Sequence, residues 1–348
     1  MADHLIPVRS DGKWGYFSTA ARKLVLPLQY DSAEAFHDGR AWVSDGRQFG
    51  CIDTQGNLTP VQKFDSVGPF GNGFAPFNQG SIQKFSAHDN EYYQTGGKWG
   101  FVNTAGAIAV PAQYDGVVGF SEGLAFLQND EPGVGPWMDT RSRCVDAAFK
   151  TLFEIELSVL YGFSEGRTVV HRRLEKFHWI DRNGREIGKP YDICWSFTEG
   201  LAGALINSGY RHVFVDLDGK EVLQAPENLN GIGAFREGLC WGLTGQPRDF
   251  GNGRWYGANS GPVGFFDRSG KWAIKPAFES ARDFHDGRAA VSLHGKWGFI
   301  NTSGRIVVPL QWDKVRDFVG GVAVVEGDGR FEVIDTKGST LWKAKSPP

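Results

Sequence analysis

The stretch Lys296–Val325, KWGFINTSGRIVVPLQWDKVRDFVGGVAVV, decides how the whole chain folds. It recurs as KWGFVNTAGAIAVPAQYDGVVGFSEGLAFL at Lys98–Leu127 and as KWGYFSTAARKLVLPLQYDSAEAFHDGRAWV from Lys13 onward. Self-similarity at such a period indicates a stack of supersecondary units rather than separate globular domains. We therefore expect residues 1–348 to form a single repeat domain.

A short turn marks the repeat most regularly: Phe, any residue, usually an acid, then Gly. Successive copies lie 34 to 50 residues apart, so the basic unit has about 34 residues and some units carry insertions. The copies are FHDG at Phe36, FGNG at Phe70, FSEG at Phe120, FSEG at Phe163, FTEG at Phe197, FREG at Phe235, FHDG at Phe284 and FVGG at Phe318.

Each unit repeats the same order of elements. A short strand of small and aliphatic residues follows the Phe turn, and the KWGFI strand comes next. A turn of Asp or Asn, two residues and Gly then leads into a third strand, because the Asx side chain caps the turn and Gly accepts a positive φ. We expect this strand to stop at a proline such as Pro309, since proline cannot donate to a ladder. The least regular stretch, Cys144–Leu160, has room for one or two helical turns.

One unit cannot fold alone. Burying its aromatic and aliphatic side chains contributes roughly 10 kcal/mol, while ordering its residues costs several times more. Neighbouring units must therefore stack and cover each Phe and Trp from both sides. We predict an all-β array of about nine three- to four-stranded antiparallel meanders, like a β-propeller, with an open β-superhelix or solenoid as the alternative. The predicted units start near Leu5, Arg40, Phe74, Leu124, Arg167, Leu201, Leu239, Arg288 and Val322.

The pattern KWGFIN, G, P, QYD and F-x-EG-LA resembles the WG (or KWG) repeat family of bacterial proteins along essentially the whole chain. Units three and eight match closely, as does the first except at its hairpin turn. The fourth, fifth and sixth units lose the Trp-Gly pair. The resemblance implies an all-β repeat protein without shared catalytic residues. Proteins of this family occur alone or fused to other domains, and some are immunity proteins of bacterial toxin systems, so the resemblance implies that such a role is open to this chain.

The composition and the pattern of apolar residues argue against binding to nucleic acid or membranes and against secretion. A net charge of −3, with scattered Lys and Arg, argues against nucleic acid and against an anionic membrane. The start lacks a basic region followed by an apolar run, and no apolar run is long enough to span a bilayer. The four cysteines form no CxxC and are expected to be buried free thiols. These features predict a cytoplasmic protein.

Two insertions carry the main functional signal. They run from Asn78 to Gly97 and from Thr244 to Gly261, both between the strand after the Phe turn and the KWG strand. Insertions in one slot of a repeat should crowd one face, which is often the binding face. Aromatic and arginine side chains dominate binding hot spots. The predicted partner-binding residues are Phe85, His88, Asp89, Tyr92, Tyr93, Asp249, Phe250, Arg254, Trp255 and Tyr256. The alternative is that these segments only pack on the array.

Catalytic and metal chemistry finds little support in the residues. His171 and His178 have no carboxylate at a metal-ligand spacing, and HExxH and GxSxG are both missing. The acids of the Phe turns, such as Glu122 and Glu199, more plausibly satisfy backbone amides than transfer protons. We therefore predict no catalytic residues, no metal and no cofactor.

The leading hypothesis is a non-catalytic scaffold that binds another protein. A bacterial toxin or effector is the partner that the family resemblance implies. The alternative is a carbohydrate or cell-wall ligand module in which Tyr92, Tyr93, Trp255 and Tyr256 stack on sugars. An enzyme with its site on the strands after the Phe turns is disfavoured, because those strands consist of Ala, Gly, Val and Leu.

Overall fold

The secondary structure of the chain consists of β-strands. The computed structural model describes residues 3–59, 63–86, 91–130, 140–171, 176–206, 211–245, 248–249, 255–256 and 261–345. None of these residues is helical, so none belongs to a helix that could cross a membrane. The stretch Cys144–Leu160, where one or two helical turns were an option, forms strands β13, β14 and β15 instead.

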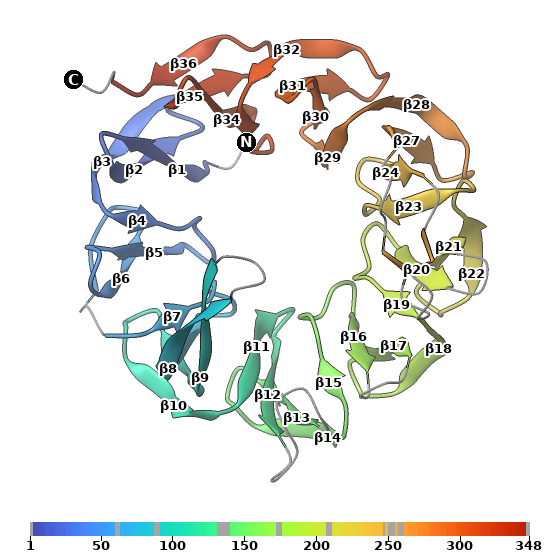
Figure 1. Cartoon of the computed structure of the whole chain (residues 1–348). Coiled ribbons are helices and arrows are strands. Elements are labelled where there is room, and N and C mark those ends of the chain that lie inside the picture. Colours follow the sequence, from blue (N-terminus) through green and yellow to red (C-terminus); the bar gives the residue numbers. More distant parts are fainter. Residues whose placement is uncertain are drawn as a thin grey trace. The chain divides into compact units, whose positions relative to one another are not determined.

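The described residues form nine antiparallel sheets of three or four strands, which we call blades 1 to 9 (Figure 1), and one sheet of two strands. Blades 1 to 3 contain β1 (Leu5–Ser10), β2 (Lys13–Ser18) and β3 (Lys23–Tyr30); β4 (Ser32–Ala33), β5 (Arg40–Ser44) and β6 (Phe49–Asp53); and β7 (Ser66–Val67), β8 (Phe74–Ser86), β9 (Glu91–Asn103) and β10 (Ile108–Tyr114). Blades 4 to 6 contain β11 (Gly116–Ser121), β12 (Leu124–Asp130), β13 (Thr140–Asp146) and β14 (Thr151–Ile155); β15 (Ser158–Val159), β16 (Arg167–His171), β17 (Phe177–Asp181) and β18 (Glu186–Tyr191); and β19 (Ile193–Cys194), β20 (Ala202–Ile206), β21 (Arg211–Val215) and β22 (Glu221–Gln224). Blades 7 to 9 contain β23 (Leu229–Ile232), β24 (Leu239–Thr244), β27 (Val263–Asp267) and β28 (Trp272–Phe278); β29 (Ser280–His285), β30 (Arg288–Leu293), β31 (Lys296–Asn301) and β32 (Ile306–Trp312); and β33 (Lys314–Val315), β34 (Val322–Gly327), β35 (Arg330–Asp335) and β36 (Thr340–Lys343). A separate two-stranded sheet pairs β25 (Arg248–Asp249) with β26 (Trp255–Tyr256).

The chain divides into two compact units. One comprises Met1–Gly12, Tyr16–Leu28 and Ile187–Pro348, and the other comprises Lys13–Gly15 and Gln29–Glu186.

The predicted fold class, a β-propeller-like array of antiparallel meanders, is confirmed, and so is the repeat grammar. Each predicted unit start coincides with a strand, within one residue. The structure adds a strand that the sequence pattern did not separate. In blades 2 to 9 the segment before the Phe turn pairs with the strand after it, so it opens the blade instead of linking two units.

The Phe turn joins the first and second strands of a blade as a type I′ turn. In blade 8, Asp286 and Gly287 both have positive φ, at 51° and 72°. Type I′ turns need this at both central positions, and their twist matches that of the flanking strands. The acid can hold a left-handed conformation because Asp, Asn and similar polar residues tolerate it best. The equivalent left-handed first positions are Asp38, Asn72, Glu122, Glu165, Glu199, Glu237 and Gly320.

The phenylalanine of the turn belongs to a core that lies between two blades. Phe318 of blade 9 is buried and packs edge-on against Phe299 of blade 8, with ring centroids 4.7 Å apart. Phe284 contacts Phe265 of the preceding blade in the same way, at 4.9 Å. Each aromatic pair adds about 0.5–1.5 kcal/mol to the burial of its area. The predicted stacking of units on one another through these Phe side chains is therefore confirmed.

The acid of the Phe turn forms a second connection between neighbouring blades. The Glu237 carboxylate of blade 7 accepts hydrogen bonds from the Gly287 amide of blade 8, at 2.9 and 3.1 Å. The same contact recurs from Gly123 to Asn72, from Gly166 to Glu122, from Gly238 to Glu199 and from Gly321 to Asp286. The turn acids satisfy backbone amides, as predicted, and they do so across the blade junction, where the Asn72 side-chain oxygen takes the same role in blade 3.

Partial burial alone would raise the pKa of Glu199. Its hydrogen bonds from Arg268 and from the Gly238 and Glu237 amides outweigh that effect and hold the pKa below its usual value. The carboxylate therefore stays ionised at neutral pH, where it is a hydrogen-bond acceptor and not a proton donor.

The first and last blades pack against each other. Val8 and Phe17 of blade 1 share a core with Val322, Val324 and Val333 of blade 9. The Phe turn of blade 9 has Gly320 where its relatives carry an acid, and a Cβ there would lie 2.8 Å from the Thr19 hydroxyl of blade 1. An open superhelix does not bring its terminal units together. This contact therefore favours the propeller-like alternative.

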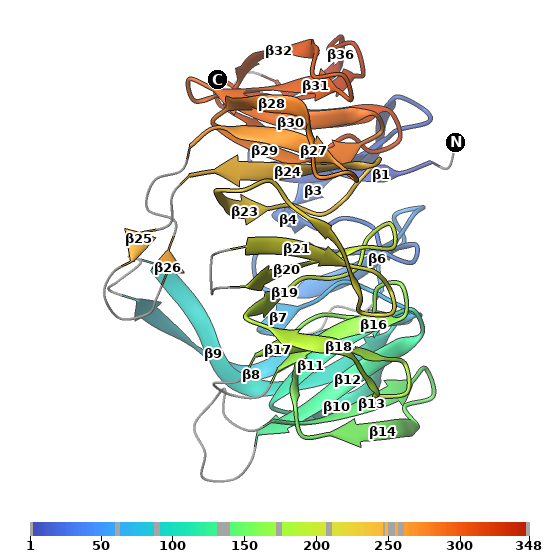
Figure 2. The same ribbon diagram turned by 90° about the vertical axis from the view of Figure 1, so that its right-hand side faces the viewer.

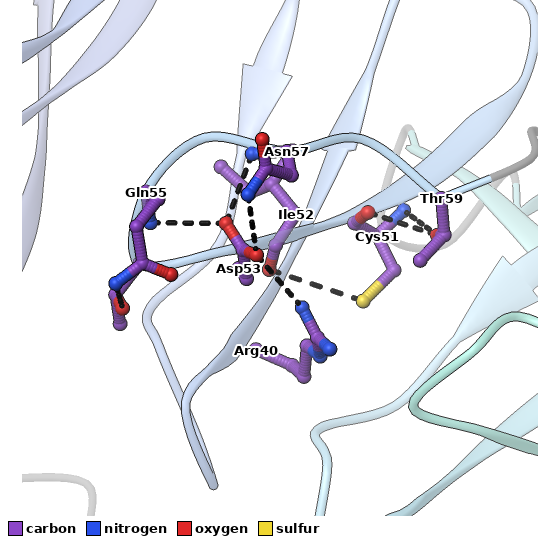
Figure 3. Close-up of polar contacts among 8 residues, drawn as sticks. Arg40, Cys51, Ile52, Asp53, Gln55, Asn57 and Thr59 are labelled. Carbon is purple, nitrogen blue, oxygen red and sulfur yellow. Dashed lines mark hydrogen bonds and ion pairs between the residues drawn. The ribbon is translucent and has the colours of Figure 1, made fainter.

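The turn that follows the third strand, the outer hairpin, is capped by an Asx side chain as predicted; in blade 2 it leads to the isolated bridge between Ile52 and Leu58 instead of a fourth strand. In Figure 3 the Asp53 carboxylate accepts hydrogen bonds from the Gln55 and Asn57 amides, both at 2.9 Å. Gly56 takes the positive φ of 86°. Blade 4 keeps the cap at Asp146 but places Phe149 at the left-handed position with φ of 58°.

The glycine of the Trp-Gly pair is required by the fourth strand. A Cβ on Gly298 would lie 2.5 Å from the Val308 carbonyl oxygen, and one on Gly100 would lie 2.4 Å from the Val110 carbonyl oxygen. Between Val308 and Trp312 the fourth strand shifts register opposite Gly298, which brings its backbone over the glycine. Only a residue without a side chain fits under such a bulge.

The expectation that the fourth strand stops at its proline is wrong. β32 continues through Pro309, and β10 continues through Pro111. These strands lie at the edge of their sheets, where a missing N–H removes no ladder bond to a further strand.

The lysine of KWG forms a salt bridge with the aspartate of QYD or QWD, as in Lys296–Asp313 and Lys98–Asp115, with the nitrogen and oxygen atoms 2.5 Å apart in both.

We predict that Glu237→Ala lowers the free energy of unfolding by about 1 kcal/mol, because the Gly287 amide loses its acceptor at a partly exposed site. Chemical denaturation measures the change. Glu154→Ala, on the exposed outer strand β14, is the control and should leave stability within about 0.5 kcal/mol of wild type. Equal effects of the two substitutions would contradict a connection between blades through Glu237.

Gly298→Ala is expected to cost about 1–3 kcal/mol, since the new methyl group must push away the backbone of the fourth strand. Gly231→Ala is the matched control, because the nearest atom to its Cβ lies 3.9 Å away. The thermal midpoint should fall for the first variant and change little for the second. A stable Gly298→Ala protein would show that the bulge does not require glycine.

Candidate functional site

The central hairpin of blade 3, which joins its second and third strands, is much longer than its counterparts. β8 and β9 have 13 residues each, and their pairing continues from Phe74↔Asn103 out to Ser86↔Glu91. The two strands extend away from their blade as a β-ribbon (Figure 2). The insertion from Asn78 to Gly97 was expected as a loop, but most of it is strand.

The insertion of blade 7 also contains paired strands. Arg248 pairs with Tyr256 and Asp249 pairs with Trp255, between the ends of β24 and β27. In blades 8 and 9 the same hairpin is closed by two residues, His294-Gly295 and Asp328-Gly329, with positive φ at both positions. A two-residue type I′ turn is therefore sufficient for a blade. The additional residues of blades 3 and 7 serve no requirement of the sheet.

The predicted partner-binding residues can be placed only in part. Six lie on described backbone: Phe85 on β8, Tyr92 and Tyr93 on β9, Asp249 on β25, and Trp255 and Tyr256 on β26. The other four, His88, Asp89, Phe250 and Arg254, lie outside the described residues. Phe85 pairs with Tyr92 across the ribbon. The two insertions belong to different compact units, so their common face stays a prediction, as does sugar stacking.

A groove of about 480 Å³ between blades 8 and 9 was not predicted from the sequence. Its apolar lining includes Trp297, Phe331 and the buried Val324. Arg282, Lys314, Arg316 and the acidic Glu326 also line it. The signal that would have found it is the cationic pair Lys314 and Arg316 directly after the QWD segment, where blade 4 has Gly116 and Val118.

The tryptophan of the KWG motif is less covered than the stacking argument required. Trp14, Trp99 and Trp297 are each half-buried, whereas Phe299 beside Trp297 is fully buried. Phenylalanine therefore fills the junctions, and the motif indole keeps part of its surface accessible. In blade 8 this surface faces the groove, with the Arg282 guanidinium 5.9 Å from the ring centroid.

The four cysteines are buried and free, as predicted. Burial raises the pKa of Cys51 to about 11 and that of Cys144 to about 12, and it also raises the pKa values of Cys194 and Cys240. A thiol with such a pKa carries almost no thiolate at neutral pH. These side chains are therefore unsuited to nucleophilic chemistry.

Three of the described histidines contact aromatic or acidic neighbours. His171 packs on Phe177 with centroids 4.9 Å apart, and the His178 Nε2 atom lies 3.5 Å from Glu186. Burial against Trp195 lowers the pKa of His212 to about 4, so this ring is neutral at physiological pH. Among the described residues, no group of three or more His, Cys, Asp or Glu has an arrangement suited to a metal ion.

Comparison with known protein families finds one family model that matches five segments of the chain. The model of the WG containing repeat matches residues 14–46, 49–81, 99–131, 264–297 and 297–331. Each match begins on the strand that carries the glycine of the Trp-Gly pair, which is β2, β6, β9, β27 or β31. No curated protein sequence matches the chain.

Similar solved structures share little sequence with this chain. The computationally designed Ika8 protein is 9% identical over 97% of this chain and 98% of its own, with a TM-score of 0.49. BamB from Moraxella catarrhalis is 9% identical over 97% and 90% of the two chains, with a TM-score of 0.44. Apo AztD from Citrobacter koseri is 11% identical over 99% and 94%, with a TM-score of 0.42. The repeat matches, together with the bulge that explains their glycine, establish that this chain belongs to the WG-repeat family.

Proposed function

We propose that this protein is a non-catalytic scaffold that binds another protein through the extended central hairpins of blades 3 and 7. The observation that carries the proposal is the ribbon of β8 and β9, which continues its ladder to Ser86↔Glu91, whereas two residues close the same hairpin in blade 8. Ordered segments that a fold does not need are where binding residues concentrate.

The chemistry of the insertions supports a protein partner. A β-ribbon offers backbone groups along both of its outer edges, so an extended chain can add to it as a further strand. The residues around the ribbon tips are rich in aromatics and arginine, the types that dominate protein hot spots. Repeat scaffolds of this kind are typically non-catalytic, and the buried cysteines with their raised pKa values agree with such a role.

A bacterial toxin or effector is the specific partner that we infer from the resemblance to the WG-repeat family. In this role the scaffold would neutralise its partner by covering it. Four buried free thiols support a cytoplasmic site of action, where thiols stay reduced. The experiment below does not depend on knowing the partner in advance.

Replacing residues 80–97 with the dipeptide Asn-Gly should shorten blade 3 to the pattern of blade 8, because Gln79 and Lys98 pair across the ribbon as Leu293 and Lys296 do. Replacing residues 245–261 in the same way shortens blade 7. We expect each variant to keep its cooperative unfolding transition and to lose most of the capture of the partner protein from the native host, measured by quantitative affinity purification.

The matched control replaces His294-Gly295 of blade 8 with Asn-Gly, which changes the same hairpin without removing an insertion. Capture should be the same as in the wild type. If both shortened variants fold and still retain the partner at wild-type levels, the hairpins are not the binding surface and the proposal is wrong.

A further inference from the structure

The groove between blades 8 and 9 has a distinctive combination of charges and aromatic surface. Trp297 and Phe331 are half-buried and form apolar walls above the buried Val324 and Val325. Three cations, Arg282, Lys314 and Arg316, line it together with one acid, Glu326. The whole chain carries a net charge of −3, so this cationic lining departs from the general surface.

We propose that this groove binds a carboxylate-bearing segment of the partner protein, with an apolar or aromatic side chain next to the acid lying against Trp297 and Phe331. The inference rests on the protein-binding function proposed above and assigns the partner's chemistry at this point. The central hairpins of blades 8 and 9 flank the groove, since β31 begins at Lys296 and β35 begins at Arg330. It therefore opens at the end of the blades where blade 7 carries its insertion.

Two of the cations, Lys314 and Arg282, are held loosely enough to accept an incoming acid. The Lys314 ammonium lies 3.7 Å from Glu326, and the lysine side chain is 78% exposed. Arg282 lies 3.6 Å from Asp317 and is 46% exposed. Exposed ion pairs at such distances contribute little, typically below about 1 kcal/mol. A carboxylate placed between these cations can therefore compete for them at small cost.

The aromatic walls supply the apolar part of the interaction. The Arg282 guanidinium lies 5.9 Å from the Trp297 ring centroid, which fixes a cation beside an accessible indole face. Tryptophan and arginine are among the residue types most enriched in interface hot spots, and both line this groove. The volume of about 480 Å³ suits a few side chains of a protein segment.

The adjacent blade junction lacks this chemistry. The groove of about 320 Å³ between blades 7 and 8 is lined by Pro262, Phe278 and Leu293 together with the acidic Glu279. That groove is lined by other positions of the repeat, and none of its lining residues is a cation. The cations Lys314 and Arg316 come from the segment directly after the QWD motif of blade 9.

The test selects a phage library of random dodecapeptides on the full-length protein and measures the enriched sequences as fluorescein-labelled peptides by fluorescence anisotropy. We expect acids next to an aromatic or aliphatic residue, and affinity that falls as salt is raised. Lys314→Glu combined with Arg316→Glu should weaken binding at least tenfold. The neutral pair Lys314→Met and Arg316→Met should weaken it less, with an unchanged thermal midpoint.

Lys337→Glu is the control, because it makes half of that charge change on the outer hairpin of blade 9. It should leave the peptide affinity as in the wild type. Enriched peptides without acids, no enrichment at all, or equal affinity for the wild type and both groove variants would each overturn the proposal.

The two proposals can fail separately. The protein with residues 80–97 and 245–261 replaced keeps the groove residues. If it loses the partner while the groove variants retain the partner, the hairpins bind and the groove does not. If the acidic peptides require Lys314 and Arg316 while the shortened protein retains the partner, the groove inference holds and the hairpin proposal fails.

Discussion

The structure depends on the insertion of the Phe-turn phenylalanine into the neighbouring blade. Phe284 and Phe318 each contact a phenylalanine of the preceding blade, and the core clusters of both units extend over two consecutive blades. A four-stranded sheet of this size buries too little surface to pay for the ordering of its own chain. Stability therefore resides at the junctions, and a blade is folded only in the presence of its neighbour.

The motif residues follow from this arrangement. The type I′ turn that positions the phenylalanine requires two left-handed residues, and the acid in the first of them reaches the amide of the next turn, as Glu237 reaches Gly287. At the contact of blade 9 with blade 1 the acid is replaced by Gly320, where Thr19 occupies the space that a side chain would need. The repeat is thus adapted at the one junction where its two ends meet.

The repeat also shows which residues the fold requires and which are available for function. Blades 8 and 9 close their central hairpins with two residues, so the length of β8 and β9 has no structural cause within the sheet. The tryptophan of the KWG motif is half-buried, because phenylalanine already fills the junction between blades. The accessible part of its indole ring can therefore contact a ligand. Where cations surround that indole, as at Trp297, the junction between two blades gains the chemistry of a binding groove.

The sequence by itself determined the all-β repeat, the strand starts, the Asx-capped turns and the role of the turn acids as hydrogen-bond acceptors. Each of these depends on contacts within one unit or between units that are neighbours in the sequence, and the spacing of Phe, Gly and Asp records them. Only the tertiary structure revealed the opening strand of blades 2 to 9, the continuation of β32 through Pro309, the packing of Val8 against Val322 and the groove beside Trp297. These features arise where one blade meets another or where an edge strand lacks a partner, and a linear pattern does not encode which side chains a junction leaves exposed.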